Sequence, residues 1–329
     1  MNKGTKLGII LCAAGVLAIG LSWVIAGGNY KKYESNNKIT REKKTYTCSS
    51  DIDALVAIDK DCDVIVKIAD VDKPQISYYE DKDYEEVTVK ETGKTLSFER
   101  KVTFNKKHFL SISFSANELQ DNTEILLPRT FKGDINLGTL SGDISVISVE
   151  AGNFLLNASS GDIYVSDVKS DYITLSTLSG EIFAKGMQVA GEGVISSASG
   201  DIAVEDYESG SNLKTTTNSG ETGFCNVKVK ELECSAASGE VIIKDTKVDS
   251  IKSNTNSGEV TLAGLEPAKE AHFNTSSGDI SGSIKGTESD YSIAYTTGSG
   301  ECNLSNSSSG NVGLEFHTGS GDIEIGFHD

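Results

Sequence analysis

Arginine and proline are nearly missing from this chain. Its 329 residues include 3 prolines, and its three arginines, Arg41, Arg100 and Arg129, all lie before residue 130. The formal net charge is -18. Binding to nucleic acid or to anionic lipid requires clusters of basic side chains. The composition therefore argues against a nucleic-acid partner and against a basic membrane-binding face in the C-terminal part.

Apolar and aromatic residues are also scarce, at 37% and 7% of the chain. A compact globule of this length usually has a larger apolar share. The low share favours a thin, elongated fold in which each strand buries one face only.

Cysteine motifs are missing as well, although the chain has six cysteines. No Cys-x-x-Cys pair or Cys/His cluster occurs, so a zinc site has no support. Cys12 lies in an apolar segment. Cys48 and Cys62 have two interpretations, a disulfide between early strands or two buried thiols.

The longest apolar run, residues 7–26, contains no charge and follows Lys3 and Lys6. About 20 residues at helical rise span a bilayer core, so the run predicts one transmembrane helix. The alternative is a cleaved signal peptide, because Val24-Ile25-Ala26 resembles a cleavage site; we expect a retained anchor.

The orientation of this helix has two interpretations. Six basic residues between Lys31 and Lys44 follow the helix, and the positive-inside rule would keep that side in the cytoplasm. A short N-terminal tail usually stays inside, which favours the opposite. We expect a single-pass protein of the cell membrane with its repeats outside the cytoplasm.

Four segments are expected along the chain. They are a membrane anchor with a short tail (1–28), a polar basic linker (29–45), an irregular β region (46–130) and a repeat region (131–329). In the third segment, alternating apolar residues such as Ala54-Val56-Ile58 and Leu96-Phe98 predict strands that are covered on one face.

The repeat is a Ser-Gly-Asp/Glu motif that occurs ten times. Successive motif serines are 19 (Ser141 to Ser160) to 22 (Ser277 to Ser299) residues apart. A period this short is typical of a solenoid. The glycines of the motif are Gly142, Gly161, Gly180, Gly200, Gly220, Gly239, Gly258, Gly278, Gly300 and Gly321.

Apolar positions around the motif predict the geometry of each coil. The third and fifth residues after the serine and the fourth before it are mostly apolar, and the second before it is small. The inward phase thus changes at the glycine, which predicts a corner with a positive φ there. We predict an all-β fold: a two-sheet β-solenoid of roughly 20-residue coils, an N-terminal β cap region and one N-terminal transmembrane helix. Residues 324–327 are expected to cap the other end.

These features resemble the putative-adhesin, LiaG-like family of bacterial β-strand repeat proteins, whose shared domain has no assigned function. The resemblance covers residues 46–329. It rests on the membrane segment, the early strands, Ile125-Leu126-Leu127-Pro128 and the Ser-Gly-Asp-Ile series. It implies an envelope location and an adhesin-like role, and it implies no catalytic residues.

The acidic residue of each motif is the candidate site. If the corners stack in register, these carboxylates form one row, and Ca²⁺ or another cation could bridge them. The alternative, which we favour, is that acids suit turns and keep the edge soluble. The row consists of Asp143, Asp162, Glu181, Asp201, Glu221, Glu240, Glu259, Asp279, Glu301 and Asp322.

Few other residues suggest a catalytic or ligand-binding site. Glycoside hydrolysis needs two carboxylates at a set separation, and no pair stands out. Tyr164, Phe183 and Tyr207 are candidates for outward sugar-binding rings, with solvated strand residues as the favoured alternative. The four histidines are scattered and are expected to be ordinary surface or strand residues: His108, His272, His317 and His328.

We therefore expect no enzyme and no required cofactor. The chain is expected to be a membrane-anchored structural or interaction protein of the cell envelope, adhesin-like, whose partner is an envelope polymer or a membrane protein. One alternative is a regulatory component of envelope-stress signalling that docks a membrane partner. Another is a carbohydrate-active enzyme.

Overall fold

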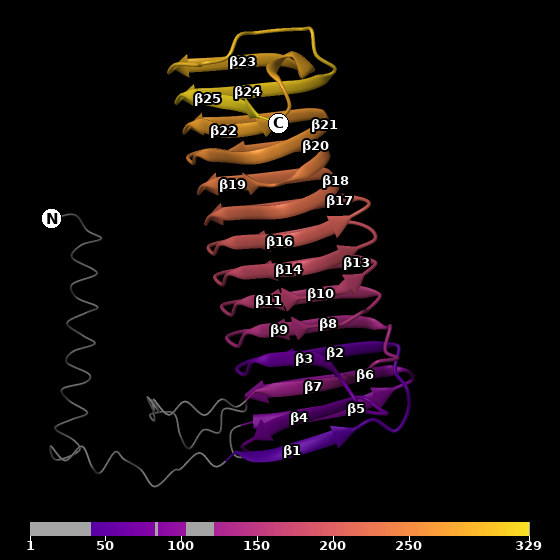
Figure 1. Cartoon of the computed structure of the whole chain (residues 1–329). Helices are drawn as coiled ribbons and strands as arrows, with labels where there is room; N and C mark the ends of the chain where they lie inside the picture. The colour runs from indigo at the N-terminus through magenta and orange to yellow at the C-terminus, as the bar shows by residue number, and fades with distance from the viewer. Residues whose placement is uncertain (1–40, 83–84, 103–121, 329) are drawn as a thin grey trace, which may run out of the picture. The chain divides into compact units, whose positions relative to one another are not determined.

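The computed structural model describes residues 41–82, 85–102 and 122–328. Within these ranges the chain has 25 strands and a single 3₁₀ turn, η3 (Glu288–Asp290). Lys43–Asp329 forms one compact unit. The prediction of an all-β solenoid is confirmed for the described residues, because the strands stack as successive coils (Figure 1).

The strands alternate between buried and exposed residues along most of their length. Those before the repeats are β1 (Glu42–Thr47), β2 (Ala54–Asp59), β3 (Val64–Ala69), β4 (Gln75–Glu80), β5 (Glu85–Thr92), β6 (Thr95–Val102) and β7 (Thr123–Pro128). The first repeats contain β8 (Asp134–Thr139), β9 (Ile144–Ile147), β10 (Asn153–Ala158), β11 (Ile163–Ser166), β12 (Lys169–Ser170), β13 (Tyr172–Thr177), β14 (Ile182–Val189), β15 (Gly193–Ser197) and β16 (Ile202–Ser209). The later repeats contain β17 (Asn212–Ser219), β18 (Thr222–Ser238), β19 (Val241–Lys244), β20 (Lys247–Thr255), β21 (Val260–Ser277), β22 (Ile280–Lys285), β23 (Tyr291–Ser299), β24 (Val312–Ser320) and β25 (Ile323–His328).

Each coil has one strand segment before the Ser-Gly corner and one after it. We call the stacked segments before the corners wall A and those after them wall B. On wall A, β10 pairs in parallel with β8 and β13, and Leu156 is in register with Leu137 and Leu175. On wall B, β11 pairs in the same way with β9 and β14. Equivalent side chains therefore stack into buried columns, which form the core between the walls.

Wall B contains a regular bend that the sequence patterns did not predict. The seventh residue after the motif serine has a positive φ in seven successive repeats. Asn, Asp and Gly tolerate this conformation best, and they occupy six of the seven positions: Ser148, Asp167, Gly186, Asp206, Asn226, Asp245 and Gly264. After the bend, the other set of alternating positions along the strand points into the core. Tyr207, which follows Asp206, is therefore 1% exposed, so the interpretation of Tyr207 as an outward ring is wrong.

At the N-terminal end the spatial order of the strands differs from their order in the sequence. β2 pairs in parallel with both β6 and β8, and β3 with both β7 and β9. The β2–β3 coil thus lies between strands that follow it in the chain. Beyond them, β4 pairs with β7 and β5 pairs with β6, both antiparallel. The region expected to be irregular contributes layers of the solenoid as well as this antiparallel end (Figure 1).

The same interleaving occurs at the C-terminal end. β24 pairs in parallel with β21 on one side and with β23 on the other, and β25 pairs with β22 (Figure 1). The last coil of the sequence is therefore an inner layer. The expectation that residues 324–327 cap this end is wrong, because β23 and the loop after it lie outside them.

That loop covers the open edge of β23. The backbone N–H of Ile293 donates to the carbonyl of Ser307, and the N–H of Ser307 donates to the carbonyl of Ile293, each at 2.9 Å. The side-chain amide of Asn303 makes the two hydrogen bonds that a neighbouring strand would make. Its Oδ1 accepts the N–H of Ile325 at 3.0 Å, and its Nδ2 donates to the carbonyl of Ile325 at 2.9 Å. Edge groups that could template another strand are thus occupied.

Candidate functional site

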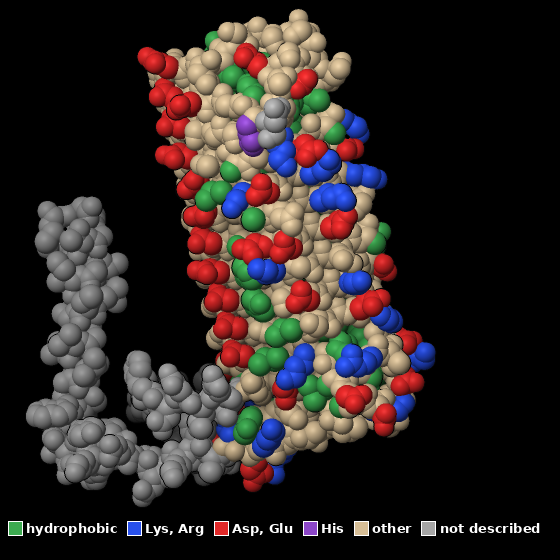
Figure 2. Space-filling model, viewed as in Figure 1, with side chains coloured by type: hydrophobic (Ala, Val, Ile, Leu, Met, Phe, Trp, Pro, Cys, Tyr) green, Lys and Arg blue, Asp and Glu red, His purple; other side chains and the backbone are tan. Residues whose placement is uncertain are grey.

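The ten motif carboxylates form one column along the corner edge of the stack. All of them are exposed except Glu240, which is half-buried. Figure 2 shows acidic side chains following one edge of the molecule, beside the strands of wall B. The predicted row of stacked acids is therefore present. We call it the acidic column.

The aspartates of this column hold neighbouring coils together. Each aspartate carboxylate accepts a hydrogen bond from the backbone N–H of the acidic residue in the adjacent coil. For example, Asp143 accepts from the N–H of Asp162, and Asp162 from that of Glu181, both at 2.8 Å. The pattern begins one coil earlier, where Asp63 accepts from Asp143 at 2.9 Å. The remaining pairs are Glu221 to Asp201, Asp322 to Asp279 and Glu301 to Asp322.

No metal centre is apparent in this column. Within residues 41–82, 85–102 and 122–328, no three His, Cys, Asp or Glu side chains lie together in a way that could hold a metal ion. Neighbouring acids are one coil apart, and their aspartates already bond to backbone. The column therefore has a structural task in the fold itself.

The corner glycines are required for a different reason from the one predicted. None of the ten has a positive φ. Instead, each glycine Cα lies directly against the backbone of the neighbouring corner. A Cβ on Gly200 would come well inside 3.0 Å of the carbonyl oxygen of Gly180, a separation that real Cβ atoms essentially never show. The same contact links Gly278 to Gly321 and Gly321 to Gly300, and so follows the interleaved order of the last coils.

The small residue two positions before the motif serine is also explained by the stacking. The hydroxyl of Thr177 donates to the carbonyl of Gly161 at 3.0 Å and accepts the N–H of Gly180 at 3.1 Å. Six repeats form this bond to the adjacent glycine carbonyl. The donors are Thr177, Ser197, Thr217, Thr275, Thr297 and Thr318. We call these inward positions the hydroxyl column.

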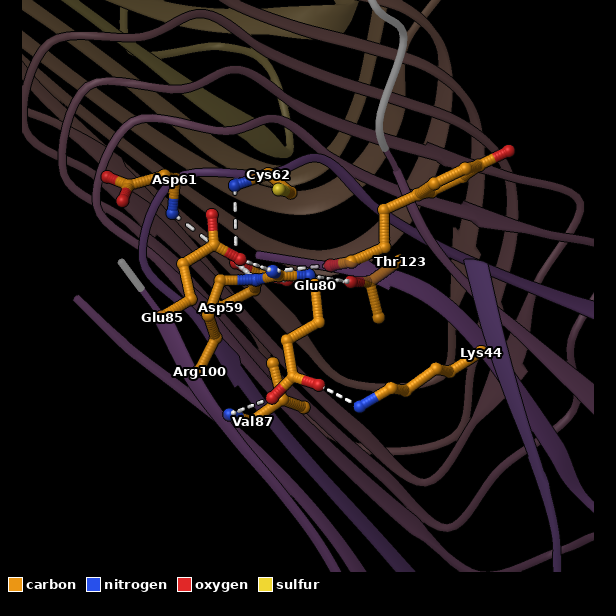
Figure 3. Close-up of polar contacts among 10 residues, drawn as sticks. Lys44, Asp59, Asp61, Cys62, Glu80, Glu85, Val87, Arg100 and Thr123 are labelled. Carbon is orange, nitrogen blue, oxygen red and sulfur yellow. Dashed lines mark hydrogen bonds and ion pairs between the residues drawn. The ribbon is translucent and has the colours of Figure 1, made fainter. Parts of the chain in front are cut away.

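A buried ion network continues the hydroxyl column at the N-terminal end. Asp59 is in register with Thr139 on wall A, and it contacts Arg100 of β6. Both Asp59 and Arg100 are 0% exposed. Figure 3 shows their side chains meeting those of Glu85 and Thr123. The sequence analysis did not identify this cluster.

Each side-chain nitrogen of Arg100 contacts an acceptor, and the longest of these bonds runs from Nη2 to the hydroxyl of Thr123 at 3.4 Å. Its Nε donates to both carboxylate oxygens of Asp59 at 2.9 and 3.1 Å, and its Nη1 donates to the carbonyl of Tyr79 at 2.7 Å and to the carboxylate of Glu85. The hydroxyl of Thr123 donates to Asp59 at 2.7 Å. Burial by itself lowers the pKa of Arg100, but the charges of Asp59 and Glu85 outweigh it and raise this pKa. The guanidinium therefore stays charged inside the fold.

The alternation of apolar residues in β6 and β2 contained a signal for the buried network of Arg100 and Asp59. Leu96 and Phe98 are buried, so the next inward position is Arg100. In β2 the predicted phase was one residue off: Leu55 and Ala57 are buried and Ile58 is 37% exposed. A shift of one residue reverses every side chain of a strand, and the correct phase points Asp59 inward.

The other candidate residues do not converge on a site. No disulfide joins Cys48 to Cys62, which are buried thiols; burial raises the pKa of Cys48 to about 11. Tyr164 is 39% exposed and stacks on half-buried Phe183, with ring centroids 5.4 Å apart. Among the histidines, His108 lies outside the described residues. The side chain of His272 is partly exposed and contacts Glu315 at 2.8 Å, and His317 and His328 are exposed.

The repeat seen in the structure also appears in the comparison with protein families. A family model described as Toastrack DUF4097 matches residues 52–217 and again residues 194–329. The chain belongs to the Toastrack DUF4097 family. This confirms the resemblance to a family of unknown function, and the two matches overlap over residues 194–217. No curated protein sequence matches the chain.

Solved structures with similar coordinates are distant in sequence. A putative cell adhesion protein from Clostridium sporogenes is 11% identical, with 88% of this chain and 100% of the other covered and a TM-score of 0.30. A putative lipid binding protein from Parabacteroides distasonis is 18% identical, with 87% and 97% covered and a TM-score of 0.43. A putative adhesin from Parabacteroides merdae is 13% identical, with 88% and 97% covered and a TM-score of 0.34.

The predicted membrane span, residues 7–26, lies outside the described residues. Within the described part of the chain, no helix has the length and apolar character needed to cross a bilayer.

Proposed function

We propose that this Toastrack protein is a membrane-anchored, non-enzymatic component of the cell envelope. Its solenoid would serve as a structural or interaction surface outside the cytoplasm, in the manner of an adhesin, with an envelope polymer or a membrane protein as its partner. The observation that carries the proposal is the order of the chain. An apolar run of bilayer length, residues 7–26, precedes a basic linker and then one compact unit, Lys43–Asp329.

The chemistry of the solenoid supports a non-enzymatic role. Glycoside hydrolysis requires two carboxylates that face one substrate bond, one as an acid and one as a base or nucleophile. The acidic column instead places one acid on each coil, and its aspartates bond to backbone N–H groups. These carboxylates are engaged in stacking the coils.

Labelling of engineered cysteines in intact cells tests the location. Thr216 is exposed on wall A, and its neighbour Thr215 is 0% exposed. With the half-buried Cys225 and Cys302 replaced by Ser, we expect a membrane-impermeant maleimide to label Thr216→Cys in intact cells and to label Thr215→Cys only after denaturation. Labelling of Thr216→Cys only after lysis would place the solenoid in the cytoplasm and contradict the proposal.

A further inference from the structure

The two walls differ in their central outward columns, although wall A also has exposed apolar side chains outside that column, among them Leu155 and Tyr172. On wall A, the central outward position is three residues before the motif serine, and it is polar or Gly in every repeat. These residues are Gly138, Asn157, Ser176, Ser196, Thr216, Ser235, Asn254, Asn274, Thr296 and His317. A strand face in contact with water is expected to have this polar character.

Wall B instead has outward apolar side chains on five successive coils and, beyond the β18 coil, on a sixth. They come from β3, β9, β11, β14, β16 and β19, and all are half-buried or exposed. We call them the apolar stripe, which consists of Ile65, Ile147, Tyr164, Phe183, Ala203 and Ile242. Figure 2 shows apolar side chains along this face, beside the acidic column. Contiguous exposed apolar surface on a soluble unit marks an interaction site.

The centre of the stripe is a stacked aromatic pair. Tyr164 is in register with Phe183, and their ring planes differ by 10°. The next residues in the same column are Ala203 and Gly223, which are small. A Cβ on Gly223 would meet no atom within 4 Å. The surface next to the aromatic pair is therefore open to a partner's side chains.

Carboxylates border the stripe on both sides. On the corner side, an acidic residue lies two positions before five of the six stripe residues, as Asp162 does before Tyr164; the exception is Ile147, which follows Asp143 by four positions. On the other side lie the bend residues Asp167 and Asp206. In the described part of the chain, none of these acids forms an ion pair with Lys or Arg: Asp143, Asp162, Asp167, Glu181, Asp201 and Asp206.

The lysine beside the aromatic pair is already neutralised, and the exposed Lys244 lies two residues after Ile242, at the far end of the stripe. Lys185, two residues after Phe183, pairs with Glu205 at 2.9 Å. The aromatic centre of the stripe thus lies in a negative field, which attracts cationic partners and repels anionic ones. A lysine or arginine placed over Tyr164 or Phe183 would also gain a cation–π contact.

We propose that the apolar stripe of wall B docks a basic polypeptide segment of a partner protein, in which apolar side chains lie between lysines or arginines. The apolar side chains cover the stripe around Tyr164 and Phe183, and the basic side chains reach the carboxylates on either side. This inference rests on the proposed interaction function and names the surface and the kind of partner.

Peptide binding to the purified full chain tests the docking surface. The chain is held in nanodiscs of zwitterionic lipid, with empty nanodiscs as the blank, and the probe is a short peptide of alternating lysine and leucine. The test variant is Tyr164→Ser with Phe183→Ser. The matched control is Leu155→Ser with Tyr172→Ser, which removes two exposed apolar side chains (40% and 57%) from wall A.

We expect the wall B variant to bind the peptide about tenfold more weakly than the unsubstituted chain, since part of two aromatic side chains no longer leaves water. The wall A control should bind like the unsubstituted chain, and both variants should retain its circular dichroism spectrum and melting temperature. A lysine–serine peptide and a glutamate–leucine peptide should bind at least about tenfold more weakly than the lysine–leucine peptide.

Four results would overturn the proposal. They are equal binding by the wall A and wall B variants, equal binding of the lysine–serine and lysine–leucine peptides, a dimer of the full chain that only the wall B variant dissociates, and competition of the peptide by a neutral oligosaccharide. The binding assay does not depend on where the protein resides in the cell. A failed labelling experiment and a failed binding experiment therefore lead to separate conclusions.

Discussion

The same inward column is stabilised by different chemistry in the repeats and at the N-terminal end. In the repeats, hydroxyls such as that of Thr177 bond to the neighbouring glycine carbonyl. At the N-terminal end, the same column contains Asp59 and Arg100, both fully buried. The repeats are therefore stabilised by many weak, equivalent hydrogen bonds, and the N-terminal end depends on one strong buried ion network.

This difference has a physical reason. A repeat coil stacks between two coils of its own kind, so a missing hydroxyl is tolerated, as at Ala158 and Ala236, which occupy the same column. The β2–β3 coil joins the repeats to strands of different sequence. The geometry of the Arg100 network matches one arrangement of β2, β5, β6 and β7, and a buried charge without its partners is costly.

The largest effect is expected from Arg100→Met. This change leaves the carboxylates of Asp59 and Glu85 buried without the guanidinium, so the free energy of unfolding should fall by about 3–5 kcal/mol. Urea unfolding of the variant measures it, with Arg129→Met, an exposed arginine, as the control. Equal effects of the two substitutions would show that the buried network contributes no more than surface charge.

Gly200→Val should have the next largest effect. Its side chain would overlap the carbonyl of Gly180, so the two coils must separate, at a cost of about 3 kcal/mol. Asp201→Asn should cost less than about 1 kcal/mol, because the amide oxygen can still accept the N–H of Glu221. Similar losses in urea unfolding for both would contradict the close glycine stack.

Thr177→Ala should have a smaller effect, about 1 kcal/mol, since one buried hydrogen bond is lost and the column already contains alanines. Thr216→Ala, which changes an exposed threonine on the same wall, should leave the free energy of unfolding within about 0.5 kcal/mol. A loss at Thr177 as large as that at Arg100 would refute the idea that the repeats distribute their stability.

The smallest effect is expected from a change at Glu91 of β5, in the antiparallel strands of the N-terminal end, and this effect depends on pH. The N–H of Ser49, with the hydroxyls of Tyr46, Ser49 and Ser50, lowers the pKa of Glu91 to about 2. A carboxylate with a lowered pKa adds stability above its unfolded value of about 4.5 and loses it as the pH falls to about 2. Glu91→Gln should therefore be less stable than the unsubstituted chain at pH 6. This difference in stability should narrow as the pH falls from about 4.5 to about 2.

Thermal unfolding of Glu91→Gln at a series of pH values measures that gap. Glu324→Gln, which changes an exposed glutamate of β25, is the matched control. A gap for Glu91→Gln that stays constant down to pH 2, or an equal narrowing for Glu324→Gln, would show that the hydrogen bonds around Glu91 do not support the end layer.

The acidic column and the inward columns of the repeats were predictable because they depend on spacing alone. In a parallel stack with a constant period, equivalent residues must lie in register, so Asp143 and Asp162 become neighbours whatever else the chain does. The reason for the corner glycines was not predictable. A tight corner and a close backbone contact both require glycine, and only the coordinates show that Gly200 has no room for a Cβ.

By itself, the sequence determined that this protein is a β-solenoid with one acidic edge, since a motif that occurs ten times leaves few other ways to bury its apolar positions. Only the tertiary structure decided the order of the end coils, the inward phase of β2 and the meeting of Asp59 with Arg100. Parallel coils present similar edges to one another, so many stacking orders satisfy the same local pattern. The choice among them depends on contacts between residues far apart in the chain, which spacing does not encode.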